Sequence, residues 1–157
     1  MKICVFSDSH GLVDNMIAAI RLEKPEMCFF LGDGLRDLDE VMELFPDLPI
    51  YAVRGNCDFM HDVNPEIVCS VDGVRIFATH GHMYNVKYEA RLDSLTLAAR
   101  NAGASVALFG HTHMQHMSDY AGVTRINPGT IGRSRYPCYA VLETSNGGLN
   151  ADLRSLD

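Results

Sequence analysis

Eight polar side chains follow short apolar runs in the 157-residue chain, each in a loop that contains glycine. They are two carboxylates, one amide and five imidazoles, from Asp8, His10, Asp33, Asn56, His80, His82, His111 and His113. The apolar runs have the length of buried strands, and ligands of open α/β sheets gather beyond the carboxyl ends of the strands. Five separate loops are therefore expected to deliver these groups to one edge of the sheet structure.

The chemistry of these side chains predicts a metal centre. Imidazole, carboxylate and amide oxygen suit Mn²⁺, Zn²⁺, Fe²⁺ or Ni²⁺, whereas Ca²⁺ and Mg²⁺ prefer cages of oxygen ligands. Seven groups are too many for one ion: Asp8, His10, Asp33, Asn56, His80, His111 and His113. If Asp33 bridges, each of two ions receives four protein ligands. Two ions about 3.5–4 Å apart can hold a hydroxide and clamp the oxygens of a transferring phosphoryl group.

Each of these residues taken alone also fits an ordinary structural role. A single His after a strand is usually a hydrogen-bonded structural residue, and Asp33 beside glycine is a typical turn former. The pair His111 and His113 is a weak signal by itself. Compatible ligand types at five strand ends favour one shared site over five independent structural roles.

Periodic apolar residues define the elements that hold these loops. Helical spacing predicts helices over residues 12–20, 35–45 and 88–102, the last one closed by Gly103. Apolar runs predict strands over residues 2–7, 27–31, 50–53, 67–71, 74–79, 105–109, 114–120, 123–127, 138–143 and 149–153. Strand–turn–helix alternation in the first half indicates βαβ units, and the short strands of the second half indicate a second, largely antiparallel sheet. The expected fold class is α/β with two sheets, in a single domain over residues 1–157.

The composition excludes several classes of protein. The chain carries 13 Lys plus Arg against 20 Asp plus Glu, a formal net charge of −7, so we expect no broad nucleic-acid binding. An apolar fraction of 47% excludes intrinsic disorder, and no apolar run reaches the roughly 18–20 residues that cross a bilayer. The five cysteines form no CxxC pair, which indicates a reducing, cytoplasmic location. A homo-oligomer is compatible with the sequence.

Five motifs carry a family resemblance: Asp8-Ser9-His10, Gly32-Asp33, Gly55-Asn56-Cys57-Asp58, Thr79-His80-Gly81-His82 and Gly110-His111-Thr112-His113. In this order, from residue 8 to about residue 130, they resemble the motifs of the calcineurin-like metallophosphoesterases. The small size and the Gly-Asn-Cys-Asp sequence resemble the compact prokaryotic phosphodiesterase subgroup, which is also similar to the eukaryotic retromer scaffold subunit. The resemblance implies two facing mixed sheets flanked by helices, a four-layer α-β-β-α sandwich with the site at one edge.

The resemblance also implies a role for each motif residue. One ion would be bound by Asp8, His10 and His113, the other by Asn56, His80 and His111, with Asp33 bridging. The ions would be Mn²⁺, with Ni²⁺, Zn²⁺, Fe²⁺ or Mg²⁺ as alternatives. The implied reaction is hydrolysis of a phosphodiester, or alternatively a phosphomonoester, by a metal-bridging hydroxide, with a small phosphate ester as substrate. Two divalent ions would make the site positive despite the acidic chain.

Two further functions have candidate residues. Cys57 stands where the broader superfamily often has a His that protonates the leaving group, and a thiol is a poor replacement at neutral pH. His82 is the candidate catalytic acid, with core packing as its alternative role. Asn56 and Arg133 are candidates for contacting the phosphate, although Arg133 also fits a solvated loop residue.

Residues near these motifs have supporting roles to consider. Asp58 is expected to orient a metal ligand, and Met60, His61 and Tyr84 are candidates for lining a substrate pocket.

Two alternatives to an enzyme stay open at this point. One is a non-catalytic scaffold or protein-binding module on the same fold, and the other is a single-metal structural site.

Overall fold

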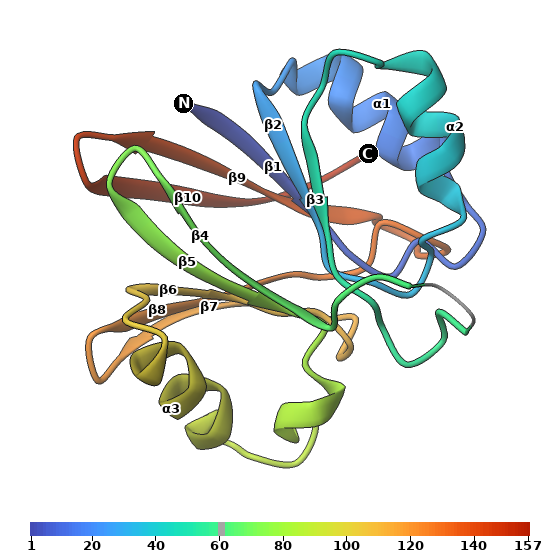
Figure 1. The fold of residues 1–157 in the computed structure, drawn as a ribbon. Coiled ribbons are helices and arrows are strands. Elements are labelled where there is room, and N and C mark those ends of the chain that lie inside the picture. Colours follow the sequence, from blue (N-terminus) through green and yellow to red (C-terminus); the bar gives the residue numbers. More distant parts are fainter. Residues whose placement is uncertain (60–61) are drawn as a thin grey trace.

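Two five-stranded sheets face each other in the computed structural model, which describes residues 1–59 and 62–157 (Figure 1). The first sheet contains β1 (Lys2–Phe6), β2 (Met27–Phe30), β3 (Ile50–Ala52), β9 (Cys138–Ser145) and β10 (Gly148–Ser155). The second contains β4 (Glu66–Val71), β5 (Val74–Thr79), β6 (Val106–Leu108), β7 (Gln115–Tyr120) and β8 (Val123–Pro128). The helices are α1 (Asp14–Glu23), α2 (Asp37–Leu44) and α3 (Asp93–Asn101), with a 3₁₀ turn, η1 (His82–Tyr84).

Both sheets mix parallel and antiparallel pairs. The first has the order β10-β9-β1-β2-β3, with β1, β2 and β3 parallel and the β9–β10 hairpin antiparallel to β1. The second has the order β4-β5-β6-β8-β7, with β5, β6 and β8 parallel. The expectation of a largely antiparallel second sheet is therefore wrong. The C-terminal hairpin returns to the first sheet, and β6 enters the second in parallel to both of its neighbours.

Three apolar clusters separate the four layers of the fold. Side chains of both sheets, such as Val5, Phe29 and Ile76, form the central one. A second cluster lies between the first sheet and helices α1 and α2, and a third between the second sheet and α3. Burial of these faces is the main driving force for this arrangement. It confirms the α-β-β-α sandwich, with α1 and α2 on one outer face and α3 on the other (Figure 1).

The helix predicted over residues 88–102 is shorter than expected. It begins at Asp93, because Leu92 adopts a left-handed backbone with φ +55°. The Glu89 carboxylate accepts hydrogen bonds from the backbone N–H and the hydroxyl of Ser94. Glu89, which precedes the helix, thus provides an acceptor for an N–H group of the first turn that has no partner within the helix. The predicted end is confirmed, since Gly103 follows the helix with φ +70°. In the described part of the chain, no helix combines the length and apolar composition needed to cross a membrane.

A buried carboxylate joins α1 to the first sheet. Glu23 accepts hydrogen bonds from the Tyr139 hydroxyl at 2.8 Å and from Arg154 Nη1 at 2.7 Å, and Lys2 Nζ lies 2.7 Å from Oε2. Burial alone would raise the pKa of Glu23, but the bonds from Lys2, Arg154 and Tyr139 outweigh it and lower the pKa to about 2. The ion pair therefore stabilises the folded chain most when Glu23 is ionised.

The Glu23→Gln variant is expected to lose stability in a pH-dependent way. Because the folded pKa is below the unfolded value of 4.5, the stabilisation is complete above pH 4.5 and is lost as the pH falls through about 2. We expect a loss of about 2–3 kcal/mol at pH 7 in urea unfolding, shrinking steadily below pH 4.5. The exposed Glu40→Gln on α2 is the matched control, and an equal loss at pH 7 and pH 2.5 would contradict the assignment.

Candidate metal centre

The ligand-bearing loops follow strands β1, β2, β5 and β6 and are tied to one another by backbone hydrogen bonds. The N–H of Asp8 donates to Gly32 O at 2.9 Å, and the N–H of His10 donates to Asp33 O at 3.0 Å. In the second sheet, the N–H of Gly110 donates to His80 O at 2.9 Å. These bonds hold loops that are distant in the sequence at the same edge, as the strand-end pattern predicted.

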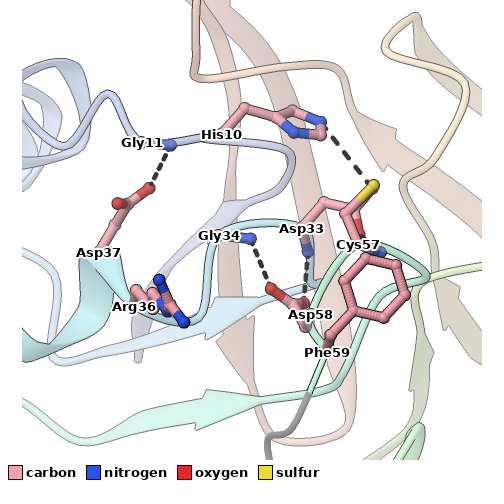
Figure 2. Close-up of a pocket in the computed structure, with 9 residues that line it drawn as sticks. All are labelled: His10, Gly11, Asp33, Gly34, Arg36, Asp37, Cys57, Asp58 and Phe59. Atoms are coloured by element: carbon pink, nitrogen blue, oxygen red, sulfur yellow. Dashed lines mark hydrogen bonds and ion pairs between the residues drawn. The ribbon is translucent and has the colours of Figure 1, made fainter.

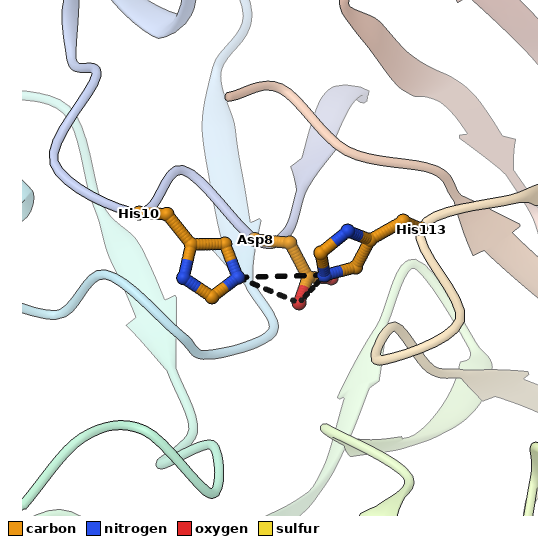
Figure 3. A group of neighbouring side chains, drawn as sticks. All are labelled: Asp8, His10 and His113. Atoms are coloured by element: carbon orange, nitrogen blue, oxygen red, sulfur yellow. Dashed lines mark hydrogen bonds and ion pairs between the residues drawn. The ribbon is translucent and has the colours of Figure 1, made fainter. Parts of the chain in front are cut away.

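Asp8 stands at the centre of the first group of ligands (Figure 3). Its side chain is fully buried, and Oδ2 accepts hydrogen bonds from Ser7 Oγ at 2.6 Å and from the His111 N–H at 3.1 Å. Its Oδ1 is buried without a hydrogen-bond partner among the described residues, and lies 3.2 Å from His113 Nε2 and 3.7 Å from His10 Nε2. A buried carboxylate oxygen facing two imidazole nitrogens is an arrangement that a divalent cation satisfies.

Asp33 belongs to the second group and also reaches the first. Its Oδ2 lies 3.3 Å from His80 Nε2 and 3.8 Å from His10 Nε2, and His80 Nε2 lies 3.2 Å from His111 Nδ1. His80 Nδ1 lies 2.7 Å from Leu31 O, and a carbonyl can only accept, so Nδ1 carries the proton. In the neutral ring, Nε2 then has a lone pair directed at the site. Asp33 is thus placed between the two groups, where a bridging ligand would have to lie.

The site shifts the pKa values of its members in opposite directions. Burial would raise the pKa of Asp33, but hydrogen bonds from His80 and the Cys57 N–H hold it well below its usual range. Burial and the neighbouring His80 lower the pKa of His111 to about 4. The Asp8 carboxylate raises the pKa of His113. Burial would lower the pKa of His80, but Asp33 and Asp8 raise it. The ionised Asp33 and the neutral His111 are thus in the protonation states that metal binding requires, whereas His80 and His113 would have to release a proton to bind an ion.

The backbone is strained at the ligand positions. Asp8, His10, Asp33, His111 and His113 all have φ between +47° and +68°, in the left-handed region that residues other than glycine rarely adopt. Such residues typically cost about 1–3 kcal/mol each and gather at functional sites. Close contacts add to the constraint, because a Cβ on Gly110 would meet Ser7 Oγ at 2.0 Å and one on Gly55 would meet Asp33 Oδ1 at 2.2 Å. The loops therefore hold these five side chains in fixed positions, and the strained backbone lowers the stability of the folded chain.

Asp58 fixes the loop that carries Asp33. Its buried carboxylate accepts four backbone hydrogen bonds at 2.7–3.0 Å, from the N–H groups of Asp33, Gly34, Leu35 and Gly55. Figure 2 shows the bonds from Asp33 and Gly34. Asp58 therefore joins the loop after β2 to the loop after β3. The expectation that Asp58 orients a metal ligand stays a prediction. In the structure Asp58 binds the backbone around Asp33 and not the Asp33 side chain.

Asp58→Asn is expected to destabilise the site selectively. Each carboxylate oxygen accepts two of the four bonds, and an amide has one acceptor oxygen. Two of the four bonds are therefore lost, and two N–H groups are left facing the new NH₂ group. We expect a loss of about 2–3 kcal/mol in urea unfolding and weaker binding of Mn²⁺ in calorimetry. Asp39→Asn, on the exposed face of α2, is the control. Unchanged stability and unchanged metal affinity would show that the four bonds do not position Asp33.

Comparisons with known proteins are consistent with this geometry. The family model described as the calcineurin-like phosphoesterase superfamily domain matches residues 1–147. The chain belongs to this superfamily. The probable metallophosphoesterase YsnB of Bacillus subtilis is 32% identical over 150 residues, covering 93% of this chain and 86% of its own. A phosphodiesterase of Methanocaldococcus jannaschii is 30% identical over 148 residues, covering 82% and 83%.

Solved structures share the fold of this phosphoesterase. A Streptococcus pneumoniae protein described as a predicted phosphoesterase matches with a TM-score of 0.80 at 27% identity, covering 98% of this chain and 88% of that one. Vps29 of Entamoeba histolytica, complexed with Zn²⁺, matches with a TM-score of 0.77 at 17% identity, covering 99% of each chain. At this identity the match to Vps29 shows a common fold only.

Three residues predicted for the site lie at its margin in this phosphoesterase. Asn56 is exposed, and its amide donates to Cys57 Sγ at 3.5 Å. His82 contacts the site more closely, with its ring centroid 5.5 Å from that of His80 and 6.2 Å from that of His111, and its buried Nδ1 has no partner among the described residues. Arg133 is an exposed loop residue that follows Gly132, whose backbone packs against the carbonyls of Asp8 and Ser9.

Of the three residues expected to line a substrate pocket, the structure describes one. Met60 and His61 lie outside the described residues. Tyr84 is held by other contacts, since its hydroxyl donates to Glu66 and its ring packs edge-on against Phe77. Burial and the Glu66 carboxylate raise the pKa of Tyr84 to about 12, so it stays a neutral hydrogen-bond donor at neutral pH.

Two residues of the site make contacts that the sequence analysis did not predict. The buried Asn127 donates to Gly110 O at 3.0 Å and to Thr112 Oγ1 at 2.9 Å, and so braces the loop of His111 and His113. The N–H of Cys57 donates to Asp33 Oδ1 at 2.7 Å, and its sulfur lies in a group with His10 and Asp33. Burial and the Asp33 charge raise the pKa of the Cys57 thiol, so it is a poor proton donor at neutral pH.

Beside the ligands lies a cavity of about 320 Å³ (Figure 2). Its lining comprises His10, Gly11, Asp33, Gly34, Arg36, Asp37, Cys57, Asp58 and Phe59. Its size is at the lower end of small-ligand sites. Because two of the candidate ligands, His10 and Asp33, form part of the wall, a molecule held in the cavity would lie against the candidate metal centre.

Proposed function

We propose that this phosphoesterase is a metal-dependent phosphodiesterase with a dinuclear centre. The proposal rests on one observation above all: two groups of ligands, Asp8 with His10 and His113, and His80 with His111, meet at Asp33. Asn56 completes the second group in the proposal. Mn²⁺ is the proposed ion, because imidazole and carboxylate ligands in this mixture suit it better than Ca²⁺.

The chain contributes positioning and charge to the reaction. Bound divalent ions supply Lewis acidity, which polarises phosphoryl oxygens and activates water as a nucleophile. The fixed imidazoles and the Asp33 carboxylate keep their geometry without reorganisation, since the Asp58 and Asn127 hydrogen bonds hold their loops. In the proposal Asn56 and Arg133 contact the non-bridging oxygens of the phosphate, and His82 protonates the leaving oxygen.

The proposed substrates are small phosphodiesters, and the relative named a phosphodiesterase supports this class over monoesters. The test compares bis(4-nitrophenyl) phosphate with 4-nitrophenyl phosphate, each with added Mn²⁺. We expect faster hydrolysis of the diester by kcat/KM. Exclusive hydrolysis of the monoester would reassign the enzyme as a phosphomonoesterase.

We also propose a cytoplasmic location, which the free thiols of all five cysteines support. We further propose a single domain, which the central core shared by the two sheets supports.

A non-catalytic scaffold on the same fold is the second candidate, and the similarity to Vps29 favours considering it. The complete set of ligand residues in the sequence argues for catalysis, because a scaffold has no need to keep strained backbone at five ligand positions. A chain that binds Mn²⁺ without hydrolysing any diester or monoester would support the scaffold.

A further inference from the structure

The cavity beside the metal centre contains one cation among three carboxylates. Asp33, Asp37 and Asp58 line it together with Arg36, which begins the turn into α2 and is exposed. No carboxylate among the described residues forms an ion pair with Arg36. In the view of Figure 2, Arg36 and Phe59 lie on either side of the Asp58 carboxylate.

The three carboxylates are already occupied by donors of the chain itself. Asp37 Oδ2 accepts hydrogen bonds from the Ser9 hydroxyl and from the Gly11 N–H at 3.0 Å. Asp58 accepts four backbone N–H groups, and Asp33 Oδ1 accepts the Cys57 N–H. These bonds use the chain's own neutral donors, and in the described part of the chain none of the three carboxylates forms an ion pair with Arg36. The guanidinium of Arg36 is therefore the group in the cavity wall that is left to bind an anion from solution.

The cavity also presents an aromatic surface. Phe59 is 75% exposed although it is a large apolar side chain, and it lies one residue after the anchored Asp58. A phenyl ring held at the mouth of a cavity offers a stacking surface for a planar base. A guanidinium suits a phosphate because its planar fork can donate two parallel hydrogen bonds.

We propose that this cavity binds the part of the substrate beyond the scissile phosphate, and that the substrate is a nucleotide ester carrying a second phosphate. This inference rests on the proposed function, because the scissile phosphate occupies the adjacent metal centre. Arg36 contacts the second phosphate, and Phe59 stacks on the base. Arg36 is thus a specificity-determining residue that distinguishes doubly phosphorylated nucleotides from singly phosphorylated ones.

The test uses two chromogenic esters that differ by one group. They are thymidine 5′-(4-nitrophenyl phosphate) and the same ester with a 3′-phosphate, both with Mn²⁺ and with release of 4-nitrophenolate as the signal. We expect the 3′-phosphate to raise kcat/KM about tenfold, and Arg36→Gln to bring the ratio of the two kcat/KM values down to about one. Arg100→Gln, an exposed arginine on α3, is the matched control and should keep the preference.

A binding measurement separates failure of this inference from failure of the proposed function. Titration calorimetry with Mn²⁺ present compares thymidine 3′,5′-bisphosphate with thymidine 5′-phosphate. Tighter binding of the bisphosphate that Arg36→Gln abolishes would support the inference even if neither ester is hydrolysed. Equal binding of the two nucleotides, or a preference that survives Arg36→Gln, would overturn it. Phe59→Ala should weaken the binding of both nucleotides by the same factor. Unchanged binding of both would contradict the stacking of the base on Phe59.

Discussion

Asp33→Asn is expected to lower kcat/KM for bis(4-nitrophenyl) phosphate by at least about a thousandfold, the largest effect of any single substitution in this chain. The carboxylate lies between both ligand groups, 3.3 Å from His80 Nε2 and 3.8 Å from His10 Nε2. Asparagine keeps an oxygen that can accept the Cys57 N–H, so the loop is expected to fold. Only the negative charge shared by the two groups is lost.

The decisive readouts for Asp33→Asn are metal content and folding. We expect the variant to bind fewer ions per chain than the wild type, with an unchanged circular dichroism spectrum. Combining it with His111→Ala should leave the fold intact and hydrolysis undetectable. Asp39→Asn, which removes an exposed carboxylate on α2, should behave as wild type. Full activity of Asp33→Asn would mean that the reaction does not use this centre.

His82→Gln is expected to lower kcat by about a hundredfold for a diester with an alkyl leaving group, such as a thymidine dinucleotide. A nitrophenolate leaves without protonation, so the 4-nitrophenyl ester of thymidine 5′-phosphate should lose no more than about threefold. The position of the ring supports this role, because it lies beside His80 and His111 and its buried Nδ1 is uncommitted among the described residues.

The pH dependence of the dinucleotide reaction tests the same role. Burial and His80 lower the pKa of His82, so the protonated ring loses its proton at a lower pH than an ordinary histidine does. Dinucleotide hydrolysis is expected to fall as the pH rises through that lowered pKa, and this limb should vanish in His82→Gln. Equal losses for the alkyl and nitrophenyl esters would instead assign His82 to packing, the alternative that its half-buried position also fits.

Much of the site could be predicted because its residues follow strands in the sequence. Asp8 and His80 follow buried apolar runs, and parallel strands deliver their carboxyl ends to a common edge. The local signal does not specify which distant strands pair. That is why the C-terminal hairpin was placed in the wrong sheet, since its pairing with β1 joins residues about 140 positions apart.

A motif pointed to Asp58, but the contacts by which Asp58 and Asn127 support the ligand loops could not be found from local patterns. Asp58 acts on backbone N–H groups more than 20 residues away, and Asn127 braces a loop 15 residues away. Neither sequence motif nor periodicity records such contacts. The same holds for Arg36, whose significance depends on the neighbouring carboxylates being satisfied elsewhere. The helix start at Asp93 was missed because a left-handed Leu92 and the Glu89 contact override the apolar spacing.

The central claim is that two divalent ions held around Asp33 carry out phosphodiester hydrolysis. The most direct measurement titrates metal-free protein with Mn²⁺ while recording bound ions per chain and the rate of bis(4-nitrophenyl) phosphate hydrolysis. The account predicts that activity rises with occupancy and is complete at two ions per chain. A correctly folded chain that hydrolyses no diester with any divalent ion, or that is fully active with none bound, would contradict it.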